Sequence, residues 1–382
     1  VLIKAIPFDD LKITELEGVQ QVNEHGELVF SGLMRGEKES EYISWALKKN
    51  PLVSVNVCSD SGEEKILFQG VLVDFEIQAQ NDVRYLTGVL RTNTYLLDLI
   101  PHKRSFQADR LQYQNLLTTV NNGYTDSIFI MAKGAGSNIP GLVMQYDETD
   151  WAFIKRMASR FHTVVIPDSQ RDHIAYTFGL PEDGVHYAVE TNIFSIAKNA
   201  GQIIESEDQR MPRADTFFYV LNSREIYRLG DCVTLNGVPL RVYSIKTKME
   251  GSELYHTYYL TSESGFETEE VFNENLIGLS LDAQVTSVER DTVQVLIGCD
   301  ENQAGCGTRV FPYATVYSTP DGTGWYCMPE IGDAVRLYFP CEKDADAYVA
   351  SSVHLQSSAG DERINPDFEQ GEEGGAENTA GH

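Results

Sequence analysis

Residues 145–156 read Gln-Tyr-Asp-Glu-Thr-Asp-Trp-Ala-Phe-Ile-Lys-Arg, and this stretch decides the fold. Asp147 or Thr149 can cap a helix, because a short polar side chain accepts a hydrogen bond from a free backbone N–H of the first turn. Behind this cap, large apolar residues recur at helical spacing, and basic residues gather toward the C-terminal end, where the helix dipole favours them. The pattern predicts a capped amphipathic helix. Its expected core positions are Trp151, Ile154, Met157, Ala158 and Phe161.

Most of the chain around this helix reads as short strands. Residues 53–57 alternate apolar and polar side chains, and the turn residues Asn81-Asp82 separate two strand-like runs. Residues 232–235 and 238–242 flank Asn236-Gly237, which is the strongest short-range signal for a β-hairpin. A second helix is expected between Leu111 and Val120. This pattern predicts antiparallel sheets or barrels with one solvated face.

Five short strands are expected in residues 276–356, at roughly 279–288, 292–299, 308–316, 333–340 and 346–354. So many strands in about 80 residues suit a small Greek-key barrel of the OB type. Residues 357–382 are different, because they carry seven acidic residues and one basic residue, with Ile364 and Phe368 as the large apolar side chains. Such a segment buries too little apolar area to offset its ordering entropy, so we expect a disordered acidic tail.

The charge of the chain excludes several classes of partner. The 382 residues carry a formal net charge of −27, although 42% of them are hydrophobic and can form a core. A general duplex nucleic-acid surface is excluded, because such surfaces neutralise phosphates with basic residues. Repulsion from anionic membranes is expected as well. Residues 276–356 hold four basic and eleven acidic residues, which opposes the single-stranded nucleic acid that OB folds often bind.

The residues that could carry chemistry form no recognisable catalytic or metal motif. The sequence has six cysteines, none in a C-x-x-C pair, which fits synthesis in a reducing cytoplasm. Cys299 and Cys306 leave a disulfide or metal pair open beside the simpler interpretation as buried thiols. The eight histidines lack zinc-ligand spacing, and Gly134-Ala135-Gly136 is interpreted as a turn and not as a phosphate loop. We therefore expect no cofactor, no metal and no enzyme activity.

Carboxylates are abundant enough that an acid/base pair of the glycosidase type stays an alternative. The examples that stand close together in the sequence are Glu267, Glu269 and Glu270, and Asp344 and Asp346. Solvated surface is the expected role of these side chains.

Two segments resemble one known family. Residues 139–158 resemble the "Q-Y-x-E-T-D-x-x-F-[IL]-x-R" stretch of the VgrG-like spike proteins of contractile injection systems, which also occur as phage tail hub proteins. Residues 328–339 are similar to the "M-P-x-[IV]-G-[DE]-x-V" strand of the OB domain in that family. We call residues 145–156 and 328–339 the first and second motif. The resemblance assigns structural roles to Gln145, Tyr146, Glu148, Thr149, Asp150, Trp151, Phe153, Ile154, Arg156, Pro329, Gly332 and Asp333.

The resemblance implies a mainly β fold with α+β insertions: two tube-like β-barrel hub domains, then a small OB-fold barrel and the acidic tail. The expected ranges are 1–105 for the first hub region, 106–275 for the second, 276–356 for the OB barrel and 357–382 for the tail. It further implies a homotrimer whose six barrels cap a hexameric inner tube protein. Baseplate proteins and a spike-tip or effector protein are the other implied partners, in a particle assembled from protein made in the bacterial cytoplasm and delivered to a target cell envelope.

The sequence departs from the family after Ser357. A triple-stranded β-helix is expected there, but no repeated alternating Val pattern follows. The needle is then short or absent, or another protein supplies it, or the chain is cut, and whether Val1 and His382 are natural ends stays open. Two other functions also stay open: a tail-associated cell-wall hydrolase, and a module that binds a sugar or a protein.

Overall fold

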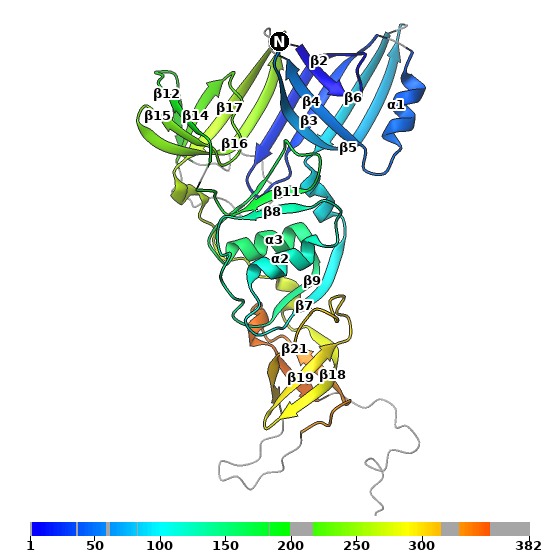
Figure 1. Ribbon diagram of the computed structural model, residues 1–382, viewed down its shortest axis with the longest axis vertical. Helices are drawn as coiled ribbons and strands as arrows, with labels where there is room; N and C mark the ends of the chain where they lie inside the picture. The colour runs from blue at the N-terminus through cyan, green and yellow to red at the C-terminus, as the bar shows by residue number, and fades with distance from the viewer. Residues whose placement is uncertain are drawn as a thin grey trace, which may run out of the picture.

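The computed structural model describes residues 2–35, 37–58, 62–81, 83–182, 184–198, 217–314 and 328–351. The expected acidic tail, residues 357–382, lies outside these ranges. Figure 1 shows an elongated molecule with two β-rich lobes side by side at one end, a mixed α/β body in the middle and a small barrel at the other end. Within the described ranges, no helix is both long and apolar enough to cross a bilayer.

The first six strands form one lobe, which we call lobe 1. Its sheet runs in the order β1-β4-β5-β6-β3-β2. Alternating side chains fill its core, as in β1, where Ile3 and Ala5 are buried and Leu2 is exposed. Helix α1 (Glu39–Ala46) contacts β5 and buries Tyr42 against Phe8. The strands are β1 (Leu2–Ile6), β2 (Leu11–Gln21), β3 (Glu27–Met34), β4 (Leu52–Cys58), β5 (Glu64–Gln80) and β6 (Val83–Arg91).

Lobe 2 repeats this strand order with later strands, except that β12 runs parallel to β15 whereas β1 runs antiparallel to β4. Its order is β12-β15-β16-β17-β14-β13, so the strands of both lobes follow the pattern 1-4-5-6-3-2 when each lobe is numbered from its own first strand. The expected hairpin is present, because Asn236 and Gly237 adopt positive φ values of 49° and 83° between β15 and β16. The strands are β12 (His186–Val189), β13 (Ser195–Lys198), β14 (Phe217–Ser223), β15 (Cys232–Leu235), β16 (Val238–Glu250) and β17 (Glu253–Thr261).

The two lobes share one 12-stranded sheet. Strand β2 of lobe 1 pairs with β16 of lobe 2 in antiparallel register from Ser244↔Gln21 to Lys248↔Glu17. Each lobe nevertheless has its own buried apolar core, one centred on Phe30 and Phe68 and the other on Phe218 and Tyr258. The hub is therefore a pair of lobes with the same strand order that are hydrogen-bonded edge to edge.

The middle body joins the lobes to the small barrel. It combines the pair β7 (Pro101–Phe106) and β9 (Val143–Thr149) with a three-stranded sheet in the order β10-β11-β8. Helices α2 (Tyr113–Asn121) and α3 (Asp150–Ser159) supply much of its core, together with the 3-10 helix η1 (Asn93–Asp98). The strands of the three-stranded sheet are β8 (Ile128–Met131), β10 (Val165–Pro167) and β11 (Ala175–Phe178).

The five expected strands of the last region form a closed barrel in the order β18-β19-β20-β22-β21. Its core also takes in Leu142 and Met144 from the middle body. The short helices η3 (Glu263–Phe266) and η4 (Glu274–Leu276) lead into the barrel, and η5 (Asp344–Asp346) precedes its last strand. The strands are β18 (Ser280–Glu289), β19 (Thr292–Ile297), β20 (Val310–Ala314), β21 (Ala334–Tyr338) and β22 (Tyr348–Ser351). The mainly β fold class with a small barrel is thus confirmed.

Candidate functional site: the joint around residues 145–156

The first motif forms the end of β9 and the start of α3. Thr149 is the N-cap residue, and its hydroxyl accepts a hydrogen bond from the backbone N–H of Ala152 at 3.2 Å. The same hydroxyl donates to the Asp98 carboxylate at the end of η1. Phe153 and Ile154 are fully buried, and the Phe153 ring stacks on Phe106 with 5.8 Å between centroids. The expected capped helix is confirmed, with Thr149 as its cap.

Arg156 is a buried charge at the centre of this joint. Its side chain is 2% exposed and holds the Glu148 carboxylate through Nε at 3.0 Å and Nη2 at 2.9 Å. Nη2 also donates to the Met144 carbonyl at 2.8 Å. Burial lowers the pKa of Arg156, but the Glu148 and Asp344 carboxylates raise it by a larger amount. The pKa of Arg156 therefore lies above its ordinary value. Arg156 therefore stays charged and needs its partners.

One of these partners comes from the small barrel. Arg156 Nη1 lies 3.4 Å from Asp344 Oδ2, and Arg160 Nη2 lies 2.6 Å from Asp344 Oδ1. The Asp344 carboxylate also accepts the backbone N–H of Met144 at 3.0 Å. The expectation that Asp344 is a solvated surface residue is wrong, since it is buried, whereas Asp346 is exposed. The sequence could not reveal this because 188 residues separate Asp344 from Arg156.

Asp150 forms a second buried centre in the same motif. It accepts hydrogen bonds from Arg104 Nη1 at 2.6 Å and from Gln145 Nε2 at 2.9 Å through Oδ1. Its Oδ2 accepts the Tyr124 hydroxyl at 2.7 Å. Burial, followed by the Asp150 carboxylate, raises the pKa of Tyr124, which keeps its hydroxyl a donor. Gln145 Nε2 further donates to the Glu148 carbonyl at 2.9 Å, so the motif residues fix one another.

Trp151 connects the first motif to lobe 1. The side chain is 1% exposed, and its Nε1 donates to the backbone carbonyl of Asn23, just after β2, at 3.2 Å. The Asn23 side chain in turn accepts the backbone N–H of Val165 at 2.7 Å. The His25 ring lies 4.8 Å from Trp151 between centroids. One motif therefore contacts lobe 1 through Trp151 and the small barrel through Arg156.

The small barrel also contacts β7 through the loop after β19. Asp300, which is 5% exposed, accepts the backbone N–H of Ser105 at 2.9 Å and also its hydroxyl. Glu301 pairs with His102 at 2.7 Å and accepts the backbone N–H of Lys103 at 3.0 Å. This loop lies between Cys299 and Cys306, both of which are free thiols.

Tyr146 lies beside these contacts in the middle of β9. Its backbone carbonyl accepts the Asn273 side chain at 2.9 Å. The Lys103 Nζ lies 4.9 Å from the centre of the Tyr146 ring, and that ring packs against the core of the small barrel.

The second motif forms a turn within the small barrel. Gly332 has a φ of 96°, which a residue without Cβ adopts readily, and its N–H donates to the Val285 carbonyl at 2.8 Å. The Asp333 carboxylate accepts the Glu330 backbone N–H at 2.8 Å, while Pro329 is half-buried. The turn aims the chain into β21, which starts at Ala334. Among the described contacts, none joins this turn to the first motif.

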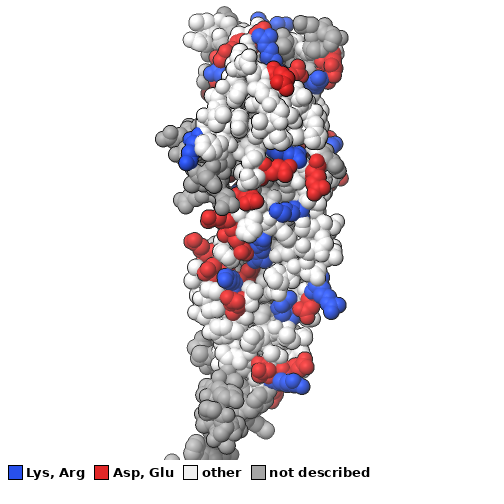
Figure 2. All heavy atoms as spheres, turned by 90° about the vertical axis from the view of Figure 1, so that its left-hand side faces the viewer, with Lys and Arg blue, Asp and Glu red and all other residues white. Residues whose placement is uncertain are grey.

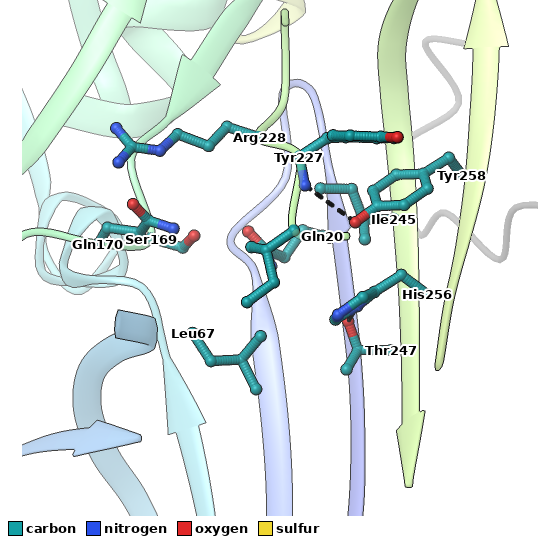
Figure 3. A pocket seen from close by; sticks show the side chains of 11 residues that line it. Gln20, Leu67, Ser169, Gln170, Tyr227, Arg228, Ile245, Thr247, His256 and Tyr258 are labelled. Carbon is teal, nitrogen blue, oxygen red and sulfur yellow. Dashed lines mark hydrogen bonds between the residues drawn. The ribbon is translucent and has the colours of Figure 1, made fainter. Parts of the chain in front are cut away.

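Two cavities beside the lobes are lined by described residues. The cavity drawn in Figure 3 lies between the lobes and has a volume of about 10 Å³. Beside it, the Tyr258 hydroxyl accepts the Tyr227 backbone N–H at 3.0 Å. A larger hollow of about 360 Å³ lies between the middle body and lobe 2. It is lined by both cations and carboxylates, and the buried Arg241 pairs there with Glu263 at 3.1 Å. No metal-binding group of three or more His, Cys, Asp or Glu occurs in the described ranges.

Charges on the surface do not form a basic patch on the face drawn in Figure 2. Acidic and basic side chains alternate along the length of that face. The surface of the described residues also carries exposed ion pairs, such as Arg84 with Glu39 at 2.8 Å and Lys248 with Glu17 at 2.9 Å.

The architecture of this chain also occurs in other proteins. No protein-family model and no curated protein matches the sequence. Among solved structures, the E. coli c3393 protein is similar, with a TM-score of 0.64, 11% identity, and coverage of 91% of this chain and 99% of that one. That protein is described as a type VI secretion system component structurally similar to the T4 bacteriophage tail proteins gp27 and gp5.

Two further structures share the architecture. A chain of the structure described as the Francisella PdpA-VgrG complex aligns at a TM-score of 0.55 and 10% identity, over 93% of this chain and 69% of that one. The 43 kDa tail protein of prophage MuSo2 from Shewanella oneidensis aligns at 0.51 and 10% identity, over 70% of this chain and 99% of that one. These identities support a statement about fold and not about activity. The resemblance found in the sequence is confirmed at that level: the chain has the fold of VgrG-like spike and phage tail hub proteins.

Proposed function

We propose that this protein is a structural hub and spike base of a contractile injection system or a phage-like tail. One observation carries the proposal: two lobes with the same strand order are hydrogen-bonded edge to edge at one end of the molecule, and a small barrel packs at the other end (Figure 1). Three copies would present six equivalent lobes to a hexameric tube, which is how a three-fold and a six-fold assembly can meet.

The joint fits a mechanical role. Force along the molecule would pass from the lobes through Trp151 and α3 to Arg156 and Asp344 in the small barrel. Buried ion pairs of this kind have specific geometry and are costly to break, so they hold two bodies in one orientation. The small barrel then continues toward the tip, where a spike-tip or effector protein would attach, and no step of this proposal requires an active site.

The proposal is tested on the purified full chain. We expect a trimer by light scattering over a range of concentrations, three-fold particles with a central channel in negative-stain images, and binding to the tube protein of the same system. A monomer at every concentration that also fails to bind the tube protein would contradict the proposal. Release of soluble peptidoglycan fragments above the buffer control would instead support the hydrolase alternative.

A further inference from the structure

The two lobes repeat their register as well as their strand order. Nine residue pairs join β5 to β6, from Val71↔Arg91 to Gln80↔Val83, and nine join β16 to β17, from Arg241↔Thr261 to Glu250↔Glu253. Adding 170 to both numbers of each pair in lobe 1 gives a pair in lobe 2 (71 + 170 = 241 and 91 + 170 = 261). The same offset relates the two β-bulges, at 72/74 and 242/244. The hairpins are therefore equivalent residue by residue.

This equivalence exposes a difference at one edge. In lobe 2, β15 pairs with the first part of β16, and β2 then pairs with residues 244–248 along the same edge. In lobe 1, β4 likewise pairs with β5 up to Val71, but the equivalent residues 74–78 have no strand beside them within the described ranges. Ser244 and Thr247 are buried, whereas their equivalents Asp74 and Ile77 are exposed and half-buried, respectively. An unpaired strand edge of this kind accepts another strand.

The second unpaired edge belongs to β13, which occupies in lobe 2 the place that β2 occupies in lobe 1. Glu17 of β2 pairs with Val29, and Val29 pairs with Val89. Ser195 of β13 pairs with Val220, which pairs with Tyr259. Since Tyr259 is the equivalent of Val89 (89 + 170 = 259), Ser195 is the equivalent of Glu17. Ile196, Ala197 and Lys198 then correspond to the next three residues of β2. Beyond β14, no described strand pairs with β13.

We propose that β13 of one copy pairs with residues 75–78 of β5 in a neighbouring copy and so repeats, between chains, the seam that β2 and β16 form within a chain. The intrachain pairs Lys248↔Glu17 and Thr247↔Gly18 predict Gln78↔Ser195 and Ile77↔Ile196. The next two intrachain pairs predict Glu76↔Ala197 and Phe75↔Lys198. The pairing is antiparallel, as in the seam. This inference rests on the proposed oligomer and specifies its interface.

The side chains at the predicted interface are compatible. Ile196 is 55% exposed in the single chain, and Ile77 packs at the margin of the lobe 1 core, so their pairing would cover apolar surface. On the opposite face of the sheet, Glu76 would lie against the small side chain of Ala197. Lys198 would lie beside Phe75, and its Nζ is already 5.8 Å from the centre of the Phe217 ring. No like charges would stand directly opposite each other in these pairs.

The pairing also explains how a closed particle forms. Every copy offers one β13 edge and one β5 edge, so the contact is heterologous and generates a ring when the rotation closes. A closed ring leaves neither edge free. That arrangement removes the aggregation hazard of exposed strand edges.

A cysteine cross-link tests the register. Copies carrying Ile77→Cys are mixed with copies carrying Ile196→Cys and oxidised under mild conditions. We expect a covalent dimer on a non-reducing gel that disappears on reduction, because directly opposite residues have Cβ atoms close enough for a disulfide. The matched control pairs Ile77→Cys with Ala197→Cys, whose side chains would point to opposite faces, and should not cross-link. The native cysteines are present in all samples and set the background.

A second variant tests the inferred interface separately from the proposed trimer. Ile196→Asp should shift the light-scattering mass of the particle toward a monomer, whereas Ile193→Asp, at an 81% exposed site outside β13, should leave the mass unchanged. Suppose instead that the wild-type chain is a trimer, the Ile77→Cys and Ile196→Cys copies do not cross-link, and Ile196→Asp keeps the mass of a trimer. These results together would overturn the inferred pairing and leave the proposed function intact. A wild-type chain that is monomeric at every concentration would overturn both.

Discussion

Arg156 Nη1 and Asp344 Oδ2 lie 3.4 Å apart although 188 residues separate them, and both side chains are about 2% exposed. Arg156 belongs to α3 in the middle body, and Asp344 to η5 in the small barrel. The pair therefore joins two parts of the chain whose local structures form separately. Because neither charge reaches solvent, the geometry of the joint depends on both being present.

Truncation of Arg156 is the direct test of the joint. We expect Arg156→Ala to lower the free energy of unfolding by about 3–5 kcal/mol, because Glu148 and Asp344 are left as buried charges without their partner. The matched control is Arg336→Ala, which removes an arginine from an exposed pair with Asp282 at 2.8 Å and should cost less than about 1 kcal/mol. Urea denaturation of both variants gives the comparison, and equal losses would contradict a special role for Arg156.

The hydrogen bond of Trp151 gives a second prediction. Trp151→Phe removes the Nε1 donor to the Asn23 carbonyl and leaves a small void, so we expect a loss of about 1–3 kcal/mol in stability. Trp45→Phe makes the same chemical change at a half-buried site on α1 and should cost less. Hydrogen exchange of the Val165 amide, which Asn23 binds, should speed up in Trp151→Phe. Unchanged exchange would show that Trp151 does not order this segment.

The burial of His256 predicts that the stability of the protein depends on pH. It is 1% exposed, its Nδ1 lies 2.9 Å from the Thr247 hydroxyl, and its Nε2 has no hydrogen-bond partner within the described structure. Burial lowers the pKa of His256 to about 4, below the value near 6.5 of an unfolded chain. As the pH falls, His256 therefore binds a proton in the unfolded state before it does so in the folded state. The contribution of neutral His256 to the free energy of unfolding is complete above pH 6.5 and declines from there toward pH 4.

The measurement compares the free energy of unfolding at pH 7.5 and pH 5 in the wild type and in His256→Gln. We expect the wild type to lose about 1–2 kcal/mol more than the variant between these two pH values, because the variant lacks the titrating group. Equal losses in the two proteins would mean that His256 does not contribute, since carboxylates titrate in both.

Substitution of Gly307 tests the contact between the small barrel and the segment after β7. Its φ is 77°, and a Cβ there would lie 2.4 Å from the Ala108 Cβ and 2.7 Å from the Ala108 nitrogen. Gly278 has a similar φ of 74° with open space around its Cβ position. Gly278→Ala therefore measures backbone strain alone, about 1 kcal/mol, while Gly307→Ala should add about 1–3 kcal/mol from the clash. Similar losses in a thermal melt would show that the two segments separate easily.

The net charge predicts how assembly responds to salt. Three copies of a chain with a charge of −27 carry 3 × 27 = 81 negative charges, and this repulsion is screened as ionic strength rises. We expect the trimer to be tighter at about 0.3 M than at 0.02 M sodium chloride, measured by light scattering at fixed protein concentration. Dissociation on adding moderate salt would instead indicate that ion pairs between copies hold the particle.

The sequence by itself determined the local structure, because local patterns depend on neighbours in the chain. Thr149 and the apolar spacing behind it specify α3, and Asn236-Gly237 specifies a hairpin through its positive φ values. The five strands of the small barrel follow from alternation between turns in the same way. The ranges of the domains and the roles of the motif residues stay predictions.

Only the tertiary structure decided which distant residues meet. Asp344 had no local signal that distinguished it from Asp346, and its burial against Arg156 arises from the packing of the barrel on α3. The sequence also hid the equivalence of the two hairpins, because strand register depends on backbone geometry while the side chains differ. When residues 71–91 are compared with residues 241–261, the same residue type occurs at the positions of Tyr85, Thr87 and Leu90. Backbone pairing is shared by all residue types, so a fold can repeat where its sequence does not.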